Sequence, residues 1–237
     1  MTLSNQTIAN DLDPVFAEMA AASFCQTGRG SELTPRELTV LSLVADVCEQ
    51  VLGTPFELHV RAALDNGLDA DDLRELLRFI SYESGYPAAL AALERLTQIE
   101  REHGLPGPTG QSHQVNADGT GSPMPAAVRA EVSALDPDFT DYMELQSRMR
   151  ADMSRISVRE RAFASMAVDV LYQTLQESFG AHVGRALGAG ATPDEVRAAV
   201  RATATFGMAR TWRALYALDA LLAEQGQSEV QQTAAAA

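Results

Sequence analysis

The chain has 237 residues, of which 46% are hydrophobic and only 6% aromatic, and its formal net charge is -14. This length accommodates one domain or two smaller ones with a substantial core. Because so acidic a chain repels phosphate groups, we expect neither nucleic acid nor a membrane surface among its partners.

The sequence shows no targeting or membrane-spanning pattern. The amino-terminal region lacks a basic segment followed by an apolar run, so we expect no secretory signal. No apolar stretch is long enough to cross a bilayer. Cys25 and Cys48 are the only two cysteines, and their spacing matches neither a redox motif nor a metal site. These features predict a reduced, cytoplasmic setting.

In chain order, the first strong helix signal covers residues 34–51. Thr34 and Glu37 have the spacing of a capping box, in which each side chain binds the backbone of the other residue. Apolar residues then occupy nearly every side of the helix, which predicts burial. Asp46 lies among them, and a buried carboxylate has to be paired or protonated.

Two further helices are predicted over residues 54–66 and 69–84. Thr54 and Glu57 have capping-box spacing, and Gly67 can end the first of these helices in the left-handed conformation. His59 lies in the first turns, where the helix dipole disfavours the charged imidazolium. His59 is therefore the leading candidate for a general base or hydrogen-bond donor. The alternative is a histidine at the edge of the core, bonded to a backbone carbonyl.

The chain contains an internal duplication. The run Leu-Asp-Pro-Val-Phe at 12–16 returns as Leu-Asp-Pro-Asp-Phe at 135–139, which is 123 residues later. The same separation relates Glu37 and Glu160, Asp46 and Asp169, Phe56 and Phe179, His59 and His182, and Arg78 and Arg201. One constant offset over this span indicates two tandem copies of one structural unit.

This duplication defines four segments. We predict a first helical repeat over 1–102, a flexible Gly/Pro-rich connector over 103–125 and a second, diverged repeat over 126–225. The polar and then Ala-only tail over 226–237 is predicted to be disordered. Since no alternating strand pattern occurs, the expected fold class is all-α.

The first repeat has a recognisable order of short motifs. They are Glu57-Leu58-His59, Ala62-Ala63, Gly67, Asp71-Asp72, and Gly85-Tyr86-Pro87-Ala88-Ala89. Their order and spacing resemble the carboxymuconolactone decarboxylase-like family, which shares the fold of alkyl-hydroperoxidase D. The resemblance covers both repeats and is better in the first. It implies helical repeats around a symmetry axis and pockets between helices. Because single-repeat members form larger rings, we expect a homo-oligomer, with a trimer as the first guess.

The resemblance also implies roles for several side chains. His59 is expected to line the pocket, and Arg61 belongs to the same His-x-Arg run as in the family. In related alkyl-hydroperoxidase D-type proteins, a glutamate in the helix corresponding to that of Glu37 joins a proton relay with the histidine. For Glu37 the alternative is the capping box alone.

Asp46 has two interpretations. The one we favour is a buried bridge to Arg78, repeated as Asp169 and Arg201 in the second copy. In the other, Asp46 orients His59 as a carboxylate orients the imidazole of a catalytic triad.

Glu83 stands where many family members have a tyrosine, and Tyr82 is displaced from that place by one residue. Glu83 is either a catalytic residue of the pocket or a solvent-exposed side chain. Tyr82 and Tyr86 are candidates for substrate binding. Arg61 and Arg78 are candidates for holding a carboxylate group of the substrate.

The second copy has counterparts of the candidate residues in His182, Glu160 and Asp169. Gly180-Ala181 replaces the Glu-Leu pair before the histidine, and Arg210 and Trp212 add bulk at the later turn. We therefore expect that the second pocket is filled and that His59, rather than His182, is the working histidine.

The thiol peroxidases of the family need two cysteines shortly before the histidine. The corresponding positions hold Leu52 and Pro55 in the first copy and Leu175 and Ser178 in the second. Thiol peroxidase chemistry is therefore not expected. The sequence also predicts no metal site and no cofactor.

The resulting hypothesis is a cofactor-independent lyase or isomerase that acts on a small carboxylated or enolisable compound, such as a lactone or a β-keto acid. The alternatives are a tailoring or cyclising protein of a biosynthetic pathway and a non-catalytic scaffold that binds a ligand.

Overall fold

The computed structural model describes residues 3–28, 32–110, 114–119 and 124–235. Within these ranges the regular elements are all helices, which confirms the all-α expectation. No helix in the described part of the chain is long and apolar enough to span a membrane.

The two repeats contain matching helices in the same order. The first repeat consists of α1 (Leu3–Leu12), α2 (Pro14–Gly28), α3 (Pro35–Cys48), α4 (Thr54–Asp65), α5 (Ala70–Ser84) and α6 (Tyr86–His103). The second consists of α7 (Ala126–Leu135), α8 (Pro137–Arg150), α9 (Val158–Tyr172), α10 (Glu177–Gly188), α11 (Pro193–Ala202), the 3-10 helix η1 (Thr203–Phe206) and α12 (Met208–Ala235). The duplication read from the sequence is thus present in the structure.

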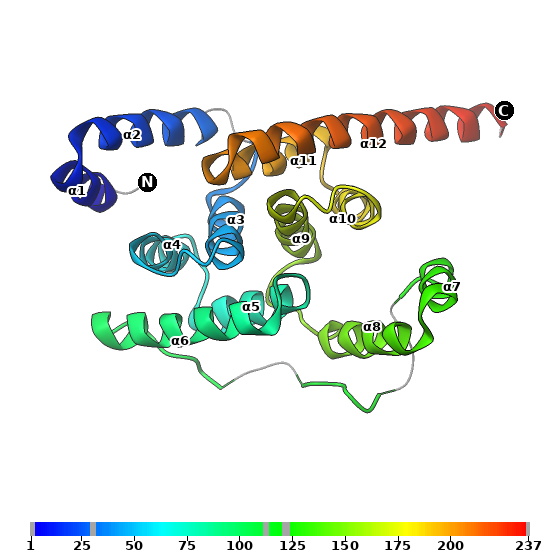
Figure 1. Cartoon of the computed structure of the whole chain (residues 1–237), viewed down its shortest axis with the longest axis horizontal. Coiled ribbons are helices and arrows are strands. Elements are labelled where there is room, and N and C mark those ends of the chain that lie inside the picture. Colours follow the sequence, from blue (N-terminus) through cyan, green and yellow to red (C-terminus); the bar gives the residue numbers. More distant parts are fainter. Residues whose placement is uncertain (1–2, 29–31, 111–113, 120–123, 236–237) are drawn as a thin grey trace.

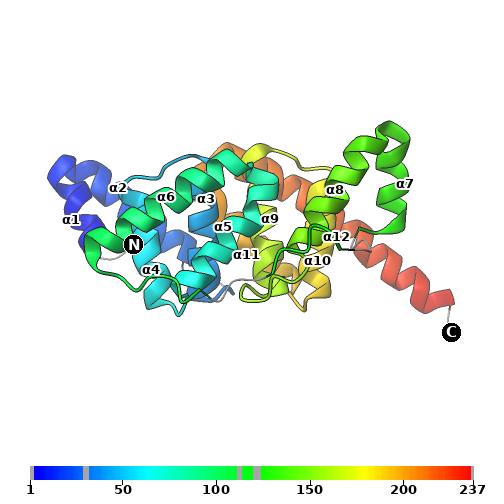
Figure 2. The ribbon, with the colours of Figure 1, turned by 90° about the horizontal axis from the view of Figure 1, so that it is seen from below.

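The repeats pack around α3 and α9, which lie side by side at the centre (Figures 1 and 2). The helices α4 and α10 lie on the outer sides of this pair. The helix α2 lies beside the second repeat's α11 and η1 (Figure 1). In turn, Arg150 of α8 contacts Phe79 and Tyr82 of the first repeat's α5. Each repeat therefore contributes a helix to the other's side of the molecule.

Two equivalent ion pairs join the repeats at the start of α3 and α9. Arg36 Nε donates to Glu160 Oε1 at 2.6 Å, and Arg159 Nε donates to Glu37 Oε1 at 2.7 Å. Both glutamates also complete the predicted capping boxes, Glu37 with Thr34 and Glu160 with Ser157. Glu37 and Glu160 therefore each cap the start of a central helix and also bind an arginine of the other repeat.

The start of α4 differs from the expectation. The helix begins at Thr54 and its cap position is Gly53, with no side-chain cap hydrogen bond. The predicted Thr54–Glu57 capping box is therefore wrong. Glu57 instead pairs with Arg61 and Arg95.

The carboxyl-terminal helix α12 continues to Ala235 and so includes most of the segment for which the sequence favours disorder. Alanine and glutamine dominate its last turns, and both have high intrinsic helix propensity.

Candidate functional site

Asp46 binds His59 and not Arg78. The Oδ2 atom of Asp46 lies 2.6 Å from Nδ1 of His59, and the Asp46 side chain is fully buried. The reason is that α4 packs back against α3, which brings one face of each helix together. The favoured Asp46–Arg78 bridge is therefore wrong, and the contact that the alternative requires, between Asp46 and the imidazole of His59, is present.

The second repeat repeats this geometry. Asp169 Oδ2 lies 2.6 Å from Nδ1 of His182. Arg201 lies at the surface and pairs with Glu32, so the predicted Asp169–Arg201 bridge is also wrong. Because a carboxylate can only accept, each histidine donates from Nδ1 and, when neutral, keeps the lone pair of Nε2 free for a substrate proton.

The two aspartates differ in their second oxygen. Asp169 Oδ1 accepts hydrogen bonds from the hydroxyls of Thr174 and Ser178, both at 2.7 Å. Asp46 Oδ1 is buried without a partner among the described residues, since Val51 and Pro55 occupy the positions of Thr174 and Ser178. Burial raises the pKa of Asp46 more than the hydrogen bond to His59 lowers it.

Glu83 belongs to the first repeat but faces the histidine of the second. Its Oε1 atom lies 3.8 Å from Nε2 of His182 and accepts a hydrogen bond from the Ser165 hydroxyl at 3.0 Å. The Glu83 side chain is only 11% exposed, so the predicted alternative of a solvent-exposed residue is wrong. Its Oε2 atom has no partner in the described part of the chain.

The environment of Glu83 favours its protonated form. Burial raises the pKa of the Glu83 carboxyl, and this effect exceeds the opposing influence of Arg150, His182 and Ser165. Arg150 Nη1 lies 3.7 Å from Glu83 Oε1, which is too long for a direct hydrogen bond. A carboxyl group with a raised pKa thus faces Nε2 of a histidine that is held by a buried aspartate.

His59 has no equivalent acid from the second repeat. Gly85 ends α5 and Gly207 ends η1. These two glycines are 122 residues apart, so the second copy is one residue shorter at this point than the offset of 123 found elsewhere. The positions that correspond to Glu83 are therefore occupied by Thr205 or Phe206, neither of which is a carboxylate.

The residues that were expected to fill the second pocket lie elsewhere. Trp212 is 63% exposed. Arg210 pairs with Glu49 and donates to the carbonyl oxygens of Leu171 and Phe206. The prediction that these two side chains fill the pocket of His182 is therefore wrong, because Trp212 is exposed and Arg210 is held at the ends of α9 and η1.

A cavity of about 430 Å³ lies where α8 meets the junction of α5 and α6. Tyr82 and Tyr86 line it, and the Tyr86 hydroxyl donates to Gln146 Oε1 at 2.8 Å. The remaining wall residues are Ser81, Gly85, Pro87, Phe139, Tyr142 and Met143. The guanidinium carbon of Arg150 stacks 3.8 Å from the centre of the Tyr82 ring. The two predicted tyrosines therefore do line one cavity.

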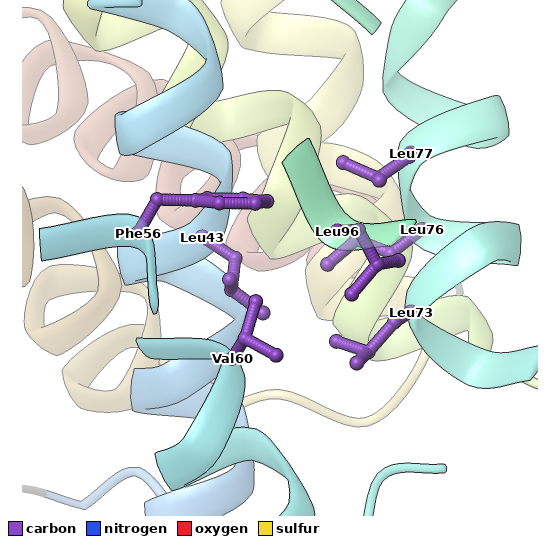
Figure 3. A pocket seen from close by; sticks show the side chains of 7 residues that line it. All are labelled: Leu43, Phe56, Val60, Leu73, Leu76, Leu77 and Leu96. Carbon is purple, nitrogen blue, oxygen red and sulfur yellow. The ribbon is translucent and has the colours of Figure 1, made fainter. Parts of the chain in front are cut away.

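A second hollow inside the first repeat is a packing feature of the core. Figure 3 shows Phe56 and Val60 of α4 facing leucines of α3, α5 and α6. The lining is entirely apolar and leaves no room for a water molecule. This hollow offers no polar group for binding or chemistry.

The remaining candidates lie outside both Asp–His pairs. Glu37 and Glu160 are engaged in capping and in the ion pairs between repeats. Arg61 pairs with Glu57 and lies 2.6 Å from His103 Nδ1. Arg78 is half-buried, and its desolvation lowers its pKa. No described contact joins Glu37, Arg61 or Arg78 to either histidine.

One group of described residues, Glu57, Glu102 and His103, has ligand atoms close enough together for a metal ion. Arg61 and Arg95 already neutralise Glu57 there, so the group fits guanidinium pairing better than a cation.

Four residues near the second histidine were missed by the sequence analysis: Ser165, Arg150, Thr174 and Ser178. A comparison of the two copies could have found Thr174 and Ser178, because Val51 and Pro55 replace them beside the first aspartate. Arg150 and Ser165 have no such signal, since their contacts with Glu83 join different repeats.

The family profile described as the carboxymuconolactone decarboxylase family matches residues 14–98 and 139–220. The chain belongs to the carboxymuconolactone decarboxylase family. A crystal structure from Burkholderia xenovorans, named as a candidate gamma-carboxymuconolactone decarboxylase subunit, superposes with a TM-score of 0.51 at 20% identity. The match covers 95% of this chain and 92% of that one and shows a shared fold. Among curated proteins, none matches this chain.

Cys48 is unsuited to thiol peroxidase chemistry, in agreement with the expectation from the sequence. Burial raises the pKa of its thiol to about 12, so the thiolate is scarce near neutral pH.

Proposed function

We propose that this member of the decarboxylase family is a cofactor-independent lyase or isomerase that transfers a proton on a small carboxylated or enolisable compound. A lactone or a β-keto acid fits this description. The observation that carries the proposal is the pairing of Glu83, with its raised pKa, and the Asp169-bound His182. A carboxyl group with a raised pKa beside a histidine is a usual arrangement for acid–base catalysis.

The proposed roles follow from the proton positions. In an isomerisation, His182 Nε2 removes a proton from the carbon next to a carbonyl, and Glu83 protonates the resulting enolate at another carbon. In a decarboxylation, the carbon–carbon bond electrons pass to the carbonyl as carbon dioxide leaves, and Glu83 protonates the new carbanion centre. Asp169 holds the imidazole in one orientation and stabilises its charged form. Thr174 and Ser178 in turn hold Asp169.

A substrate screen tests this proposal. The full chain is incubated in deuterated water with a panel of β-keto acids and unsaturated lactones, and carbon dioxide release and deuterium incorporation are followed. We expect turnover of at least one compound, with deuterium at the reprotonated carbon. Glu83→Gln should lower kcat by about 100-fold or more, whereas Glu94→Gln, an exposed position on α6, should not. Turnover that survives Glu83→Gln in a folded protein would contradict the role of Glu83, and inertness toward the whole panel would contradict the reaction class.

A further inference from the structure

The cavity between α8 and the α5–α6 junction has the features of a ligand site that the proposed reaction does not use. Its volume of about 430 Å³ falls within the range of small-molecule sites. The walls come from both repeats, since Tyr82 and Tyr86 belong to the first and Phe139 and Tyr142 to the second. Three of these rings, those of Tyr86, Phe139 and Tyr142, remain 51% exposed. Large rings that face an open hollow on several sides favour a flat, unsaturated ligand that can stack between them.

A cation lies next to this aromatic wall, although Arg150 is not itself one of the lining residues. The guanidinium of Arg150 stacks on the Tyr82 ring, and its Nε donates to the backbone oxygen of Gln146, so Arg150 contacts two of the wall residues. Its side chain is largely buried, at 16% exposed. A guanidinium in such a place normally binds a carboxylate through two parallel hydrogen bonds.

Arg150 makes no such bond among the described residues. Its contacts with the carbonyl oxygens of Gln146 and Phe79 are both long, at 3.4 Å, and the nearest carboxyl oxygen, in Glu83, lies 3.7 Å away. At this distance Glu83 forms only a long ion pair with Arg150 and no direct hydrogen bond. The cation is therefore desolvated without a full counter-charge, and a bound carboxylate is the group that it lacks.

We propose that this cavity is a binding site for an aromatic carboxylate, with the ring stacked among Tyr82, Tyr86 and Tyr142 and the carboxylate paired with Arg150. The site is distinct from the Glu83–His182 pair, but it shares Arg150 with the surroundings of Glu83. Occupation of the site would therefore draw the arginine away from the catalytic acid.

The first test uses the unaltered protein and isothermal titration calorimetry with three probes. Benzoate should bind at least about tenfold more tightly than benzamide, which has the same ring without the charge. It should also bind more tightly than cyclohexanecarboxylate, which has the charge without the flat ring. Equal affinity for benzoate and benzamide would overturn the role of the carboxylate. Equal affinity for benzoate and cyclohexanecarboxylate would overturn the aromatic part of the inference.

Variants then locate the site. Arg150→Gln should weaken benzoate binding by about tenfold or more and leave benzamide binding unchanged, and Tyr142→Ala should weaken both. Met19→Ala is the matched control, because Met19 holds the position of Tyr142 in the first repeat and is also exposed. Unchanged benzoate affinity in folded Arg150→Gln, or equal losses in Met19→Ala and Tyr142→Ala, would place binding elsewhere. Since the probe comparison needs no substitution, the proposal remains testable even if Arg150→Gln fails to fold.

Discussion

Glu83 and His182 approach each other to 3.8 Å between Oε1 and Nε2, although they belong to different repeats. Neither repeat alone therefore contains both the carboxylic acid and the histidine of the proposed acid–base pair. The duplication supplies two Asp–His pairs, at His59 and at His182. Among the residues that the structure describes, the docking of the repeats brings a glutamate to His182 alone.

This relationship predicts unequal effects of the two histidines on catalysis. His182→Gln should lower kcat by about 100-fold or more, the usual scale for a positioned acid or base. His59→Gln is the matched control and should change kcat little, because no carboxylic acid occupies the position equivalent to Glu83. Parallel kinetics on the folded variants measure the difference. The sequence alone predicts the larger loss of kcat for His59. A larger loss of kcat in His59→Gln would therefore contradict the assignment of His182 as the catalytic histidine.

The raised pKa of Glu83 predicts a pH-dependent stability difference. The fold favours the protonated carboxyl, so this contribution to stability is complete below the ordinary pKa of about 4.5 and is lost as the pH rises through the raised value. Glu83→Gln removes this loss. The Tm of the variant relative to the unaltered protein should therefore increase from pH 4.5 toward pH 8 in scanning calorimetry. Glu94→Gln should show a flat difference, and a flat difference in Glu83→Gln would show that Glu83 titrates normally.

The unpartnered oxygen of Asp46 predicts a stabilising substitution. Val51 and Thr174 follow the same turn in their repeats, since the backbone nitrogen of each donates to the carbonyl oxygen of its aspartate. Val51→Thr should place a hydroxyl against Asp46 Oδ1 and raise the unfolding free energy by about 1 kcal/mol. The reverse change, Thr174→Val, should cost about 1–3 kcal/mol by leaving Asp169 less satisfied. Urea denaturation measures both, and a destabilised Val51→Thr would show that the orphan oxygen is not costly.

The ion pairs between the repeats predict a structural role for Glu37. Glu37→Gln weakens a helix cap and removes the charge that Arg159 binds, so it should cost about 1–2 kcal/mol of stability. Glu160→Gln, its equivalent, should cost a similar amount. Neither should change kcat in protein that remains folded, as judged by circular dichroism and steady-state kinetics. A selective loss of kcat in Glu37→Gln would instead support the proton relay that the family resemblance implies.

Exposed apolar side chains predict self-association. Leu12, Phe16, Met208 and Trp212 are all more than half exposed in the single chain. They belong to neighbouring parts of the fold, since α2 contacts η1, which directly precedes α12. Apolar residues gathered on one exposed surface are typical of a protein interaction site. Light scattering should give a mass several times the 25.4 kDa of one chain, with a trimer as the first guess. A monomer at micromolar concentration would contradict this prediction.

The helices, their starts and the duplication were largely determined by the sequence. Capping pairs such as Asp69 and Asp72 are three residues apart, so their geometry is local and survives without knowledge of the fold. The constant offset between the copies likewise needs no coordinates. The Thr54 cap failed even though it is local, because Gly53 occupies the cap position.

The partners of the buried charged groups were decided by tertiary structure alone. Asp46 contacts His59 rather than Arg78 because of the side on which α4 packs against α3. The periodicity of apolar residues in the sequence does not specify this side. Glu83 meets His182, and Arg150 meets Tyr82, because α5, α8 and α10 from two repeats converge. Such contacts depend on how complete helices dock, and the free energy of docking comes from many apolar side chains rather than from the residues of the site.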